Sequence, residues 1–145
     1  MTLGGKGGGN AGLAFDVKNH ILFVACSNPQ TMVILDANDG KYLADLPIGQ
    51  GCDGAVFNPD TMECFSSQRD GTLTVIKENS PTSFVVEQTV KTMPSAKTLT
   101  LDRKTGTIYL IAAEFGPPPT NPPAGGRFRR GPIVPGSFSI LAVGK

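Results

Sequence analysis

The sequence predicts an all-β fold, and three observations support this prediction. Short runs rich in valine, isoleucine, threonine, phenylalanine and tyrosine recur along the chain, separated by turn sequences such as NDG, RDG and NSP. Eighteen glycines and twelve prolines among 145 residues supply many chain reversals. No segment of the sequence sustains the apolar period of about 3.6 residues that an amphipathic helix requires.

Length and composition indicate one globular domain over residues 1–145. The chain is 39% hydrophobic and 17% charged, which allows an ordinary apolar core. Its net charge of +1 is too small for the basic face that nucleic-acid binding requires, so no nucleic-acid partner is expected. The opening MTLGGKGGGN lacks the apolar stretch of a secretory signal, and no apolar run is long enough to span a bilayer. We therefore expect no membrane partner.

The sequence repeats itself three times. Asp16, Asn58 and Asp102 occupy corresponding positions, 42 and 44 residues apart. In each repeat a short strand leads to this Asx position, which opens a turn, and a second strand follows. The repeats are GLAFDVKNHILFVACS (12–27), GAVFNPDTMECFSSQR (54–69) and TLTLDRKTGTIYLIAA (98–113).

Further strands follow in each repeat. Second strands are expected at 20–26, 62–68 and 107–113, third strands at 31–36 and 72–78, and fourth strands at 41–48 and 84–92. Four antiparallel strands in every 42 to 44 residues are typical of a β-propeller blade. The sequence therefore predicts three blades, at about 10–50, 51–93 and 94–145.

The third repeat departs from this pattern. A segment rich in proline, glycine and arginine, 114–136, is inserted before SFSILAVGK, which supplies only a third strand. Three blades form an open arc, whereas propellers have about four to eight blades. We expect a half β-propeller of three four-stranded antiparallel blades that closes as a six-bladed propeller by homodimerisation. Residues 1–9 are expected to complete the third blade of the partner.

Several pieces of the sequence resemble the YVTN-type (YncE-like) β-propeller repeat proteins. They are LAFD, AVFNPD, LTLDRKTGTIYL and the ending SFSILAVGK. The resemblance covers nearly the whole chain and implies a propeller whose last three blades correspond to this sequence. The family resembles exported bacterial proteins, and the localisation of this chain stays open. These motifs specify the repeat and carry no information about activity.

The loops of such a fold indicate where a site would lie. By analogy with propellers, the loops entering the first strands and those joining second to third strands share one rim of the channel, where ligands bind. The candidate residues on this rim come from both sets of loops. They are Asn10, Cys52, Asp53, Lys97, Arg69 and Glu114.

Asp53 is a candidate general base near the axis of the ring. Alternatively, with Asn10 and Glu114 as further oxygen ligands, it binds a hard divalent cation such as calcium. A third interpretation is structural: Asp53 caps the turn before Gly54 by accepting backbone N–H groups. The sequence leaves open whether the chain binds a cation or no cofactor.

Lys97 occupies the equivalent place in the third blade. It is a candidate for binding an anion, stabilising an oxyanion or acting as a nucleophile, and the alternative is a solvated lysine. Cys52 is a candidate nucleophile if a base lowers its pKa, but the single histidine, His20, is expected at the opposite face. The alternative is that all three cysteines are buried structural thiols.

Arginines in the insertion are further candidates. Gly125–Gly126 provides a bend before Arg127, Arg129 and Arg130, which together with Phe128 would cover the channel mouth and hold an anionic or aromatic ligand. The alternative is a solvated loop that only bridges blades.

Two functions agree with these features. The first is a homodimeric ligand-binding or scaffold module with its site at the channel rim, taking a small anionic or ester ligand. The second is a promiscuous hydrolase of activated phosphotriesters, lactones or sulfate esters. The second draws on a resemblance to gluconolactonase-like and paraoxonase-like propellers, whose axial calcium is held by oxygen ligands. No nucleophile-elbow, phosphate-loop or zinc-protease motif is present in the sequence.

Overall fold

The chain folds into strands and turns. The computed structural model describes residues 3–118 and 131–144, except for the side chain of Asn10. The strands are β1 (Asn10–Asp16), β2 (Ile21–Ser27), β3 (Gln30–Asp36), β4 (Tyr42–Pro47), β5 (Cys52–Asn58), β6 (Glu63–Gln68), β7 (Thr72–Ser80), β8 (Ser83–Lys91), β9 (Lys97–Asp102), β10 (Thr107–Ala112) and β11 (Ser139–Val143). In these residues no helix is long and apolar enough to cross a membrane. The all-β prediction is confirmed.

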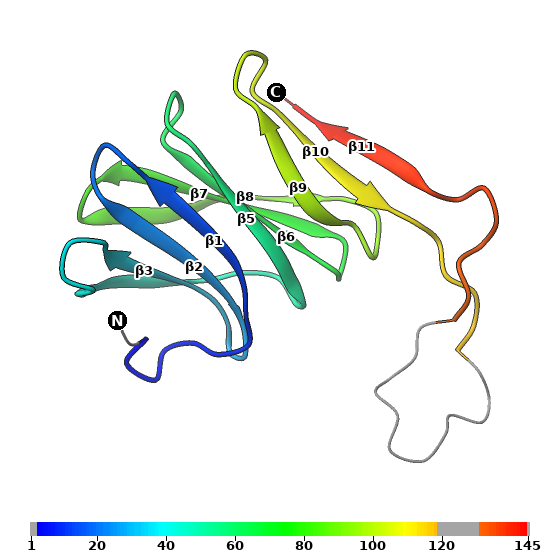
Figure 1. Ribbon diagram of the computed structural model, residues 1–145, viewed down its shortest axis with the longest axis horizontal. Helices are drawn as coiled ribbons and strands as arrows, with labels where there is room; N and C mark the ends of the chain where they lie inside the picture. Colours follow the sequence, from blue (N-terminus) through cyan, green and yellow to red (C-terminus); the bar gives the residue numbers. More distant parts are fainter. Residues whose placement is uncertain (1–2, 119–130, 145) are drawn as a thin grey trace.

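The strands form three antiparallel sheets that follow one another in chain order (Figure 1). The first blade is β1-β2-β3-β4 and the second is β5-β6-β7-β8, each paired in sequence order. The third blade is β9-β10-β11, so the described residues of this chain give it three strands. The architecture is that of a partial β-propeller.

The first strands of the three blades lie side by side. β1 packs against β5, and β5 packs against β9. β1 and β5 each carry a bulge near the start, between Asn10 and Gly12 and between Cys52 and Gly54. A Cβ placed on Gly12 would lie 2.7 Å from the carbonyl carbon of Gly54, so only glycine permits this approach.

The turns after the first strands use the predicted Asx chemistry. The side-chain oxygen of Asp16 accepts the N–H of Lys18 at 2.9 Å, and that of Asn58 accepts the N–H of Asp60 at 3.0 Å. Asp102 repeats the contact with the N–H of Lys104 at 2.9 Å. These contacts confirm that the three positions begin equivalent turns.

Apolar clusters hold neighbouring blades together. Between the first and second blades, the ring of Phe23 stacks on Phe57 at 5.3 Å and meets the edge of Phe84 at 5.9 Å. Between the second and third blades, Phe65 and Leu73 belong to one buried cluster with Leu110. We call the face of a blade that is directed toward the next blade its forward face, and the opposite face its backward face.

The backward face of the first blade is covered in part by residues 3–9 of the same chain. Leu3 packs against the buried cluster that contains Val24, Val33 and Leu35. The main chain is attached there as well, because the carbonyl of Gly8 accepts the N–H of Ser27 at 3.1 Å. The described part of the N-terminal segment thus lies along its own first blade as a turn and extended chain.

Glu78 is a buried carboxyl group at the junction of the first two blades. It is 2% exposed, and its Oε1 accepts a hydrogen bond from Asn19 Nδ2 at 2.6 Å. Burial is the main cause that raises the pKa of Glu78, and the negative charge of Asp16 adds to it. Folding therefore favours the protonated form of this side chain.

This shift predicts a pH dependence of stability. Because the pKa of Glu78 is higher in the folded than in the unfolded chain, its contribution is most favourable in acid and is lost as the pH rises through the folded value. The Glu78→Gln variant should therefore be more stable than the parent near neutral pH, and its free energy of unfolding should fall less as the pH rises above the ordinary pKa of glutamate. Urea unfolding at a series of pH values from acid to neutral measures the free energy of unfolding. Glu87→Gln is the control, because Glu87 is exposed. Parallel pH profiles for the parent and Glu78→Gln would contradict the prediction.

Candidate functional site

All three blades build their rim in the same way. The loop entering each first strand is hydrogen-bonded to the chain that leaves the second strand of the same blade. The N–H of Ser27 donates to Gly8 O at 3.1 Å, and the N–H of Arg69 donates to Gly51 O at 3.1 Å. In the third blade, Ser95 Oγ donates to Ala113 O at 2.7 Å. The two sets of loops therefore share one rim, as the sequence predicts.

Asp53 links the second blade to the third at this rim. Its Oδ1 lies 3.4 Å from Arg69 Nη2, and its Oδ2 accepts the backbone N–H of Thr98 at 3.1 Å and the Thr98 hydroxyl at 3.3 Å. The Asp53 side chain is 20% exposed. Thr98 has a positive φ of 49°, a conformation that favours glycine, and the Asp53 contacts hold it there. Asp53 accepts a backbone N–H, as its structural interpretation requires, but from the next blade rather than from its own turn.

Lys97 is the first residue of β9 and directly precedes Thr98, the residue that Asp53 contacts. The ion pairs of the described residues are Lys6–Asp45, Arg69–Asp53 and Arg103–Asp60, and none includes Lys97. The Lys97 side chain is half-buried. Its ammonium group therefore has no carboxylate of the described residues at ion-pair distance, which suits the binding of an anion.

Cys52 lies below the rim rather than on it. The residue is 5% exposed, and its Sγ is 3.5 Å from Ser66 Oγ. Burial raises the pKa of the Cys52 thiol, which disfavours the nucleophilic thiolate. His20 lies in the turns at the other end of the first blade, where its Nδ1 is hydrogen-bonded to Asn38 Oδ1 at 2.8 Å. This environment favours the structural interpretation of Cys52.

The three thiols should be inert in the folded chain. Cys26, Cys52 and Cys64 are buried, and burial raises the pKa of each. We expect Ellman's reagent to react with the native protein about a hundredfold more slowly than with the chain in denaturant, because reaction requires local opening. Absorbance kinetics measures both rates. One thiol per native chain reacting at the rate of free cysteine would show that a cysteine is accessible.

Of the remaining predicted ligand-binding residues, Glu114 is the one whose side chain the structure describes. Glu114 is exposed, and its backbone N–H donates a hydrogen bond to Ser137 Oγ at 3.0 Å. Asn10 opens β1, and nothing is described of its side chain. Arg127, Arg129 and Arg130 lie outside the described residues.

A hard-cation site does not fit the arrangement around Asp53. Both carboxylate oxygens of Asp53 are engaged, one by Arg69 and one by Thr98. Within residues 3–118 and 131–144, no group of three histidine, cysteine, aspartate or glutamate side chains is placed to hold a metal ion. We therefore derive no metal-dependent chemistry from this rim.

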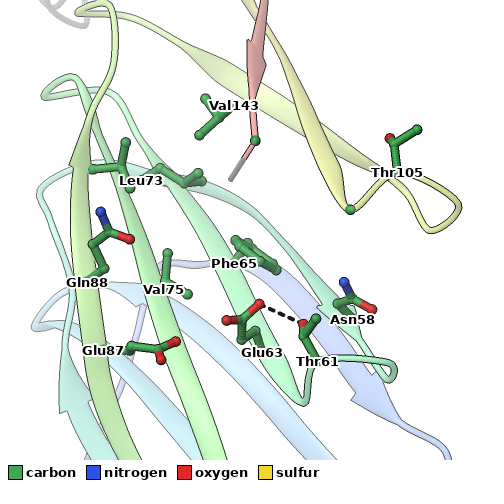
Figure 2. Close-up of a pocket in the computed structure, with 13 residues that line it drawn as sticks. Asn58, Thr61, Glu63, Phe65, Leu73, Val75, Glu87, Gln88, Thr105 and Val143 are labelled. Carbon is green, nitrogen blue, oxygen red and sulfur yellow. Dashed lines mark hydrogen bonds between the residues drawn. The ribbon is translucent and has the colours of Figure 1, made fainter.

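A cavity of about 510 Å³ lies between the second and third blades, where sequence reasoning predicted no site (Figure 2). Phe65, Leu73 and Val75 form its apolar wall, and Glu87 of β8 lies at its edge. The remaining side is the end of the third blade, at Thr105 and Val143. The cavity arises from how two blades meet, which the sequence of either blade does not specify.

Comparisons with known proteins support the fold. No family model matches the sequence, and no curated protein matches it significantly. Hydrazine synthase of Kuenenia stuttgartiensis matches the structure with a TM-score of 0.63 and 14% identity, over 74% of this chain and 31% of that chain. Sqt1 of Saccharomyces cerevisiae matches with a TM-score of 0.64 and 8% identity, over 72% of this chain and 29% of that chain.

Both of these proteins contain β-propellers, and this chain spans about a third of the length of each. At this level of identity the likeness concerns the fold alone. The strand order, the bulged first strands and these matches together show that the chain has a β-propeller-like fold.

Proposed function

We propose that this chain is half of a β-propeller that assembles with a second copy and acts as a ligand-binding scaffold at the channel rim. The observation that carries the proposal is that both end blades expose apolar faces. Leu13 and Phe15 are exposed on the first blade, and Tyr109 and Ile140 on the third. Exposed apolar surface of this kind usually marks an interaction site.

The rim supports a small anionic ligand. Arg69 and Lys97 place two cationic side chains from adjacent blades along one edge of the arc. Of these two, Arg69 forms an ion pair with a described residue, Asp53, and Lys97 forms none. A two-fold ring would bring each of them in twice around one channel. Converging cationic groups favour carboxylate, phosphate or sulfate groups.

The missing outer strand of the third blade supports the assembly. β4 and β8, the fourth strands of the first two blades, contact each other. In the third blade the described residues supply no fourth strand after β11. The cavity lined by Glu87 of β8 and Val143 of β11 occupies the position beside β8. We propose that residues 1–9 of the partner fill this position, as the YVTN-type resemblance implies for a closed ring.

Ester hydrolysis is the second candidate function, and the observation that favours it is the half-buried Lys97, which forms no ion pair with the described residues. An ammonium group in this position suits a developing oxyanion. Asp53 contributes less support as a general base, because Arg69 and Thr98 occupy its oxygens. We therefore place binding ahead of hydrolysis.

The assembly is tested by multi-angle light scattering of the 145-residue chain over a range of concentrations. The expected mass is that of two chains, and a single-chain mass at every concentration would overturn the proposal. A mass of three chains would contradict the six-bladed ring.

The rim is tested by calorimetric titration with inorganic phosphate and with citrate. Binding should be weakened about tenfold in Lys97→Ala and unchanged in Lys104→Ala, an exposed lysine in the β9–β10 turn at the other end of the blade. Equal binding by both variants would remove Lys97 from the site.

The hydrolase candidate needs its own measurement. A panel of activated phosphotriesters, lactones and sulfate esters, assayed with and without chelator, should show turnover that falls in Lys97→Ala while the dimer persists. Turnover that is unchanged in both Lys97→Ala and Asp53→Ala would exclude this rim as the active site.

A further inference from the structure

We propose that the ring closes through a specific seam in which Tyr109 of one chain packs on Phe15 of the partner subunit. The proposal rests on the assembly proposed above and specifies its contact. Its basis is that the same contact already exists inside the chain, between Phe23 of the first blade and Phe57 of the second.

The forward faces of the three blades carry equivalent aromatic residues on their second strands. With Asp16, Asn58 and Asp102 aligned, the pairings between first and second strands place Phe23, Phe65 and Tyr109 at the same position. Phe23 is 0% exposed and Phe65 is 9% exposed, because a following blade covers each. Tyr109 is 38% exposed, and the described chain supplies no blade that covers it.

The backward faces show the complementary pattern on the first strands. Phe15, Phe57 and Leu101 occupy the position just before the Asx residue. Phe57 is 8% exposed and stacks on Phe23 with ring centroids 5.3 Å apart. Leu101 packs in the cluster that contains Phe65, while Phe15 remains 43% exposed. The ring neighbour of Phe15 is His20 of the same blade, at 6.1 Å between centroids, and no described residue takes the place that Phe23 has on Phe57.

The third strands extend the forward face beyond the aromatic position. Met32 pairs with Ala25, Leu73 with Ser67, and Ile140 with Ile111, which makes Met32, Leu73 and Ile140 equivalent. Met32 and Leu73 are 0% exposed, whereas Ile140 is 68% exposed. The third blade therefore presents an apolar forward face on which none of the described chain packs.

A second copy of this chain fits both faces. A forward face already packs on a backward face twice within the chain, and two copies related by a two-fold axis repeat that contact at two seams. The N-terminal segment agrees with this arrangement. Leu3 packs on the backward face of the first blade much as Leu46 and Ile48 pack on that of the second, so it lies where the outer strand of a preceding blade belongs.

Charged substitutions test the seam by sedimentation velocity across a dilution series, with circular dichroism to verify folding. Phe15→Lys and Tyr109→Glu should each weaken the dimer about tenfold or more, because each places an unpaired charge in an apolar contact. The double variant places lysine opposite glutamate at both seams and should recover most of the affinity. Thr82→Lys is the control, since Thr82 is exposed in the β7–β8 turn of the middle blade and belongs to neither end face.

Each outcome is informative. Two weakened single variants, a recovered double variant and an unchanged control support the seam. A wild-type dimer that neither single substitution weakens would overturn the seam while leaving the proposed assembly intact, as would a double variant that recovers nothing. A wild-type monomer at all concentrations would overturn both the seam and the assembly.

Discussion

Replacing Phe23 with alanine is expected to lower the free energy of unfolding by about 3–5 kcal/mol. Phe23 is fully buried between the first two blades, where its ring contacts Phe57 at 5.3 Å and Phe84 at 5.9 Å. Truncation removes these contacts and leaves a cavity that the rigid sheets on either side cannot fill. Urea unfolding followed by far-ultraviolet circular dichroism measures the loss.

The control for this prediction is Phe138→Ala. Phe138 is 64% exposed, so its truncation should change stability by only about 0.5 kcal/mol. Similar losses in the two variants would show that Phe23 does not anchor the blade junction. A variant too unstable to fold would agree with the prediction only if Phe138→Ala remains folded under the same conditions.

Replacing Gly12 with alanine should destabilise the chain by about 1–3 kcal/mol, although alanine normally restricts the unfolded state more than glycine does. A methyl group at Gly12 would lie 2.7 Å from the carbonyl carbon of Gly54 and 2.8 Å from the nitrogen of Ala55. Both are backbone atoms, so no side-chain rotation relieves the contact. The first strands of the two blades must move apart.

Gly144→Ala is the matched control for Gly12→Ala. A methyl group at Gly144 would meet Thr107 Oγ1 at 3.6 Å, an ordinary van der Waals distance. Its stability should therefore stay within about 1 kcal/mol of the parent. Thermal unfolding of both variants makes the comparison, and equal stability would mean that β1 and β5 do not approach as closely as described.

Much of the strand order could be predicted from the sequence because the signal is local. The Asx residues Asp16, Asn58 and Asp102 and the alternating runs around them depend on neighbours a few positions away. The expected second strands at 20–26, 62–68 and 107–113 match β2, β6 and β10 to within one residue at either end. The shared rim was expected only by analogy with propellers.

The chemistry of the rim was less predictable because it depends on distant residues. Asp53 and Thr98 are 45 positions apart, yet their contact decides that the carboxylate holds the next blade. The burial that raises the pKa of Cys52 likewise comes from packing between blades rather than from its own QGCDG loop. Residue type alone allowed catalytic and structural interpretations for both side chains.

By itself, the sequence determined the all-β class, the three repeats and the residues that begin each turn, because periodicity and turn chemistry are written in consecutive residues. Only the tertiary structure decided which equivalent positions are covered. Phe57 and Phe15 occupy the same place in their repeats, but Phe57 is 8% exposed and Phe15 is 43% exposed. The physical reason is that burial depends on contacts between blades. A side chain is covered only where a neighbouring blade packs against it, and the sequence of one repeat does not specify which blades have neighbours.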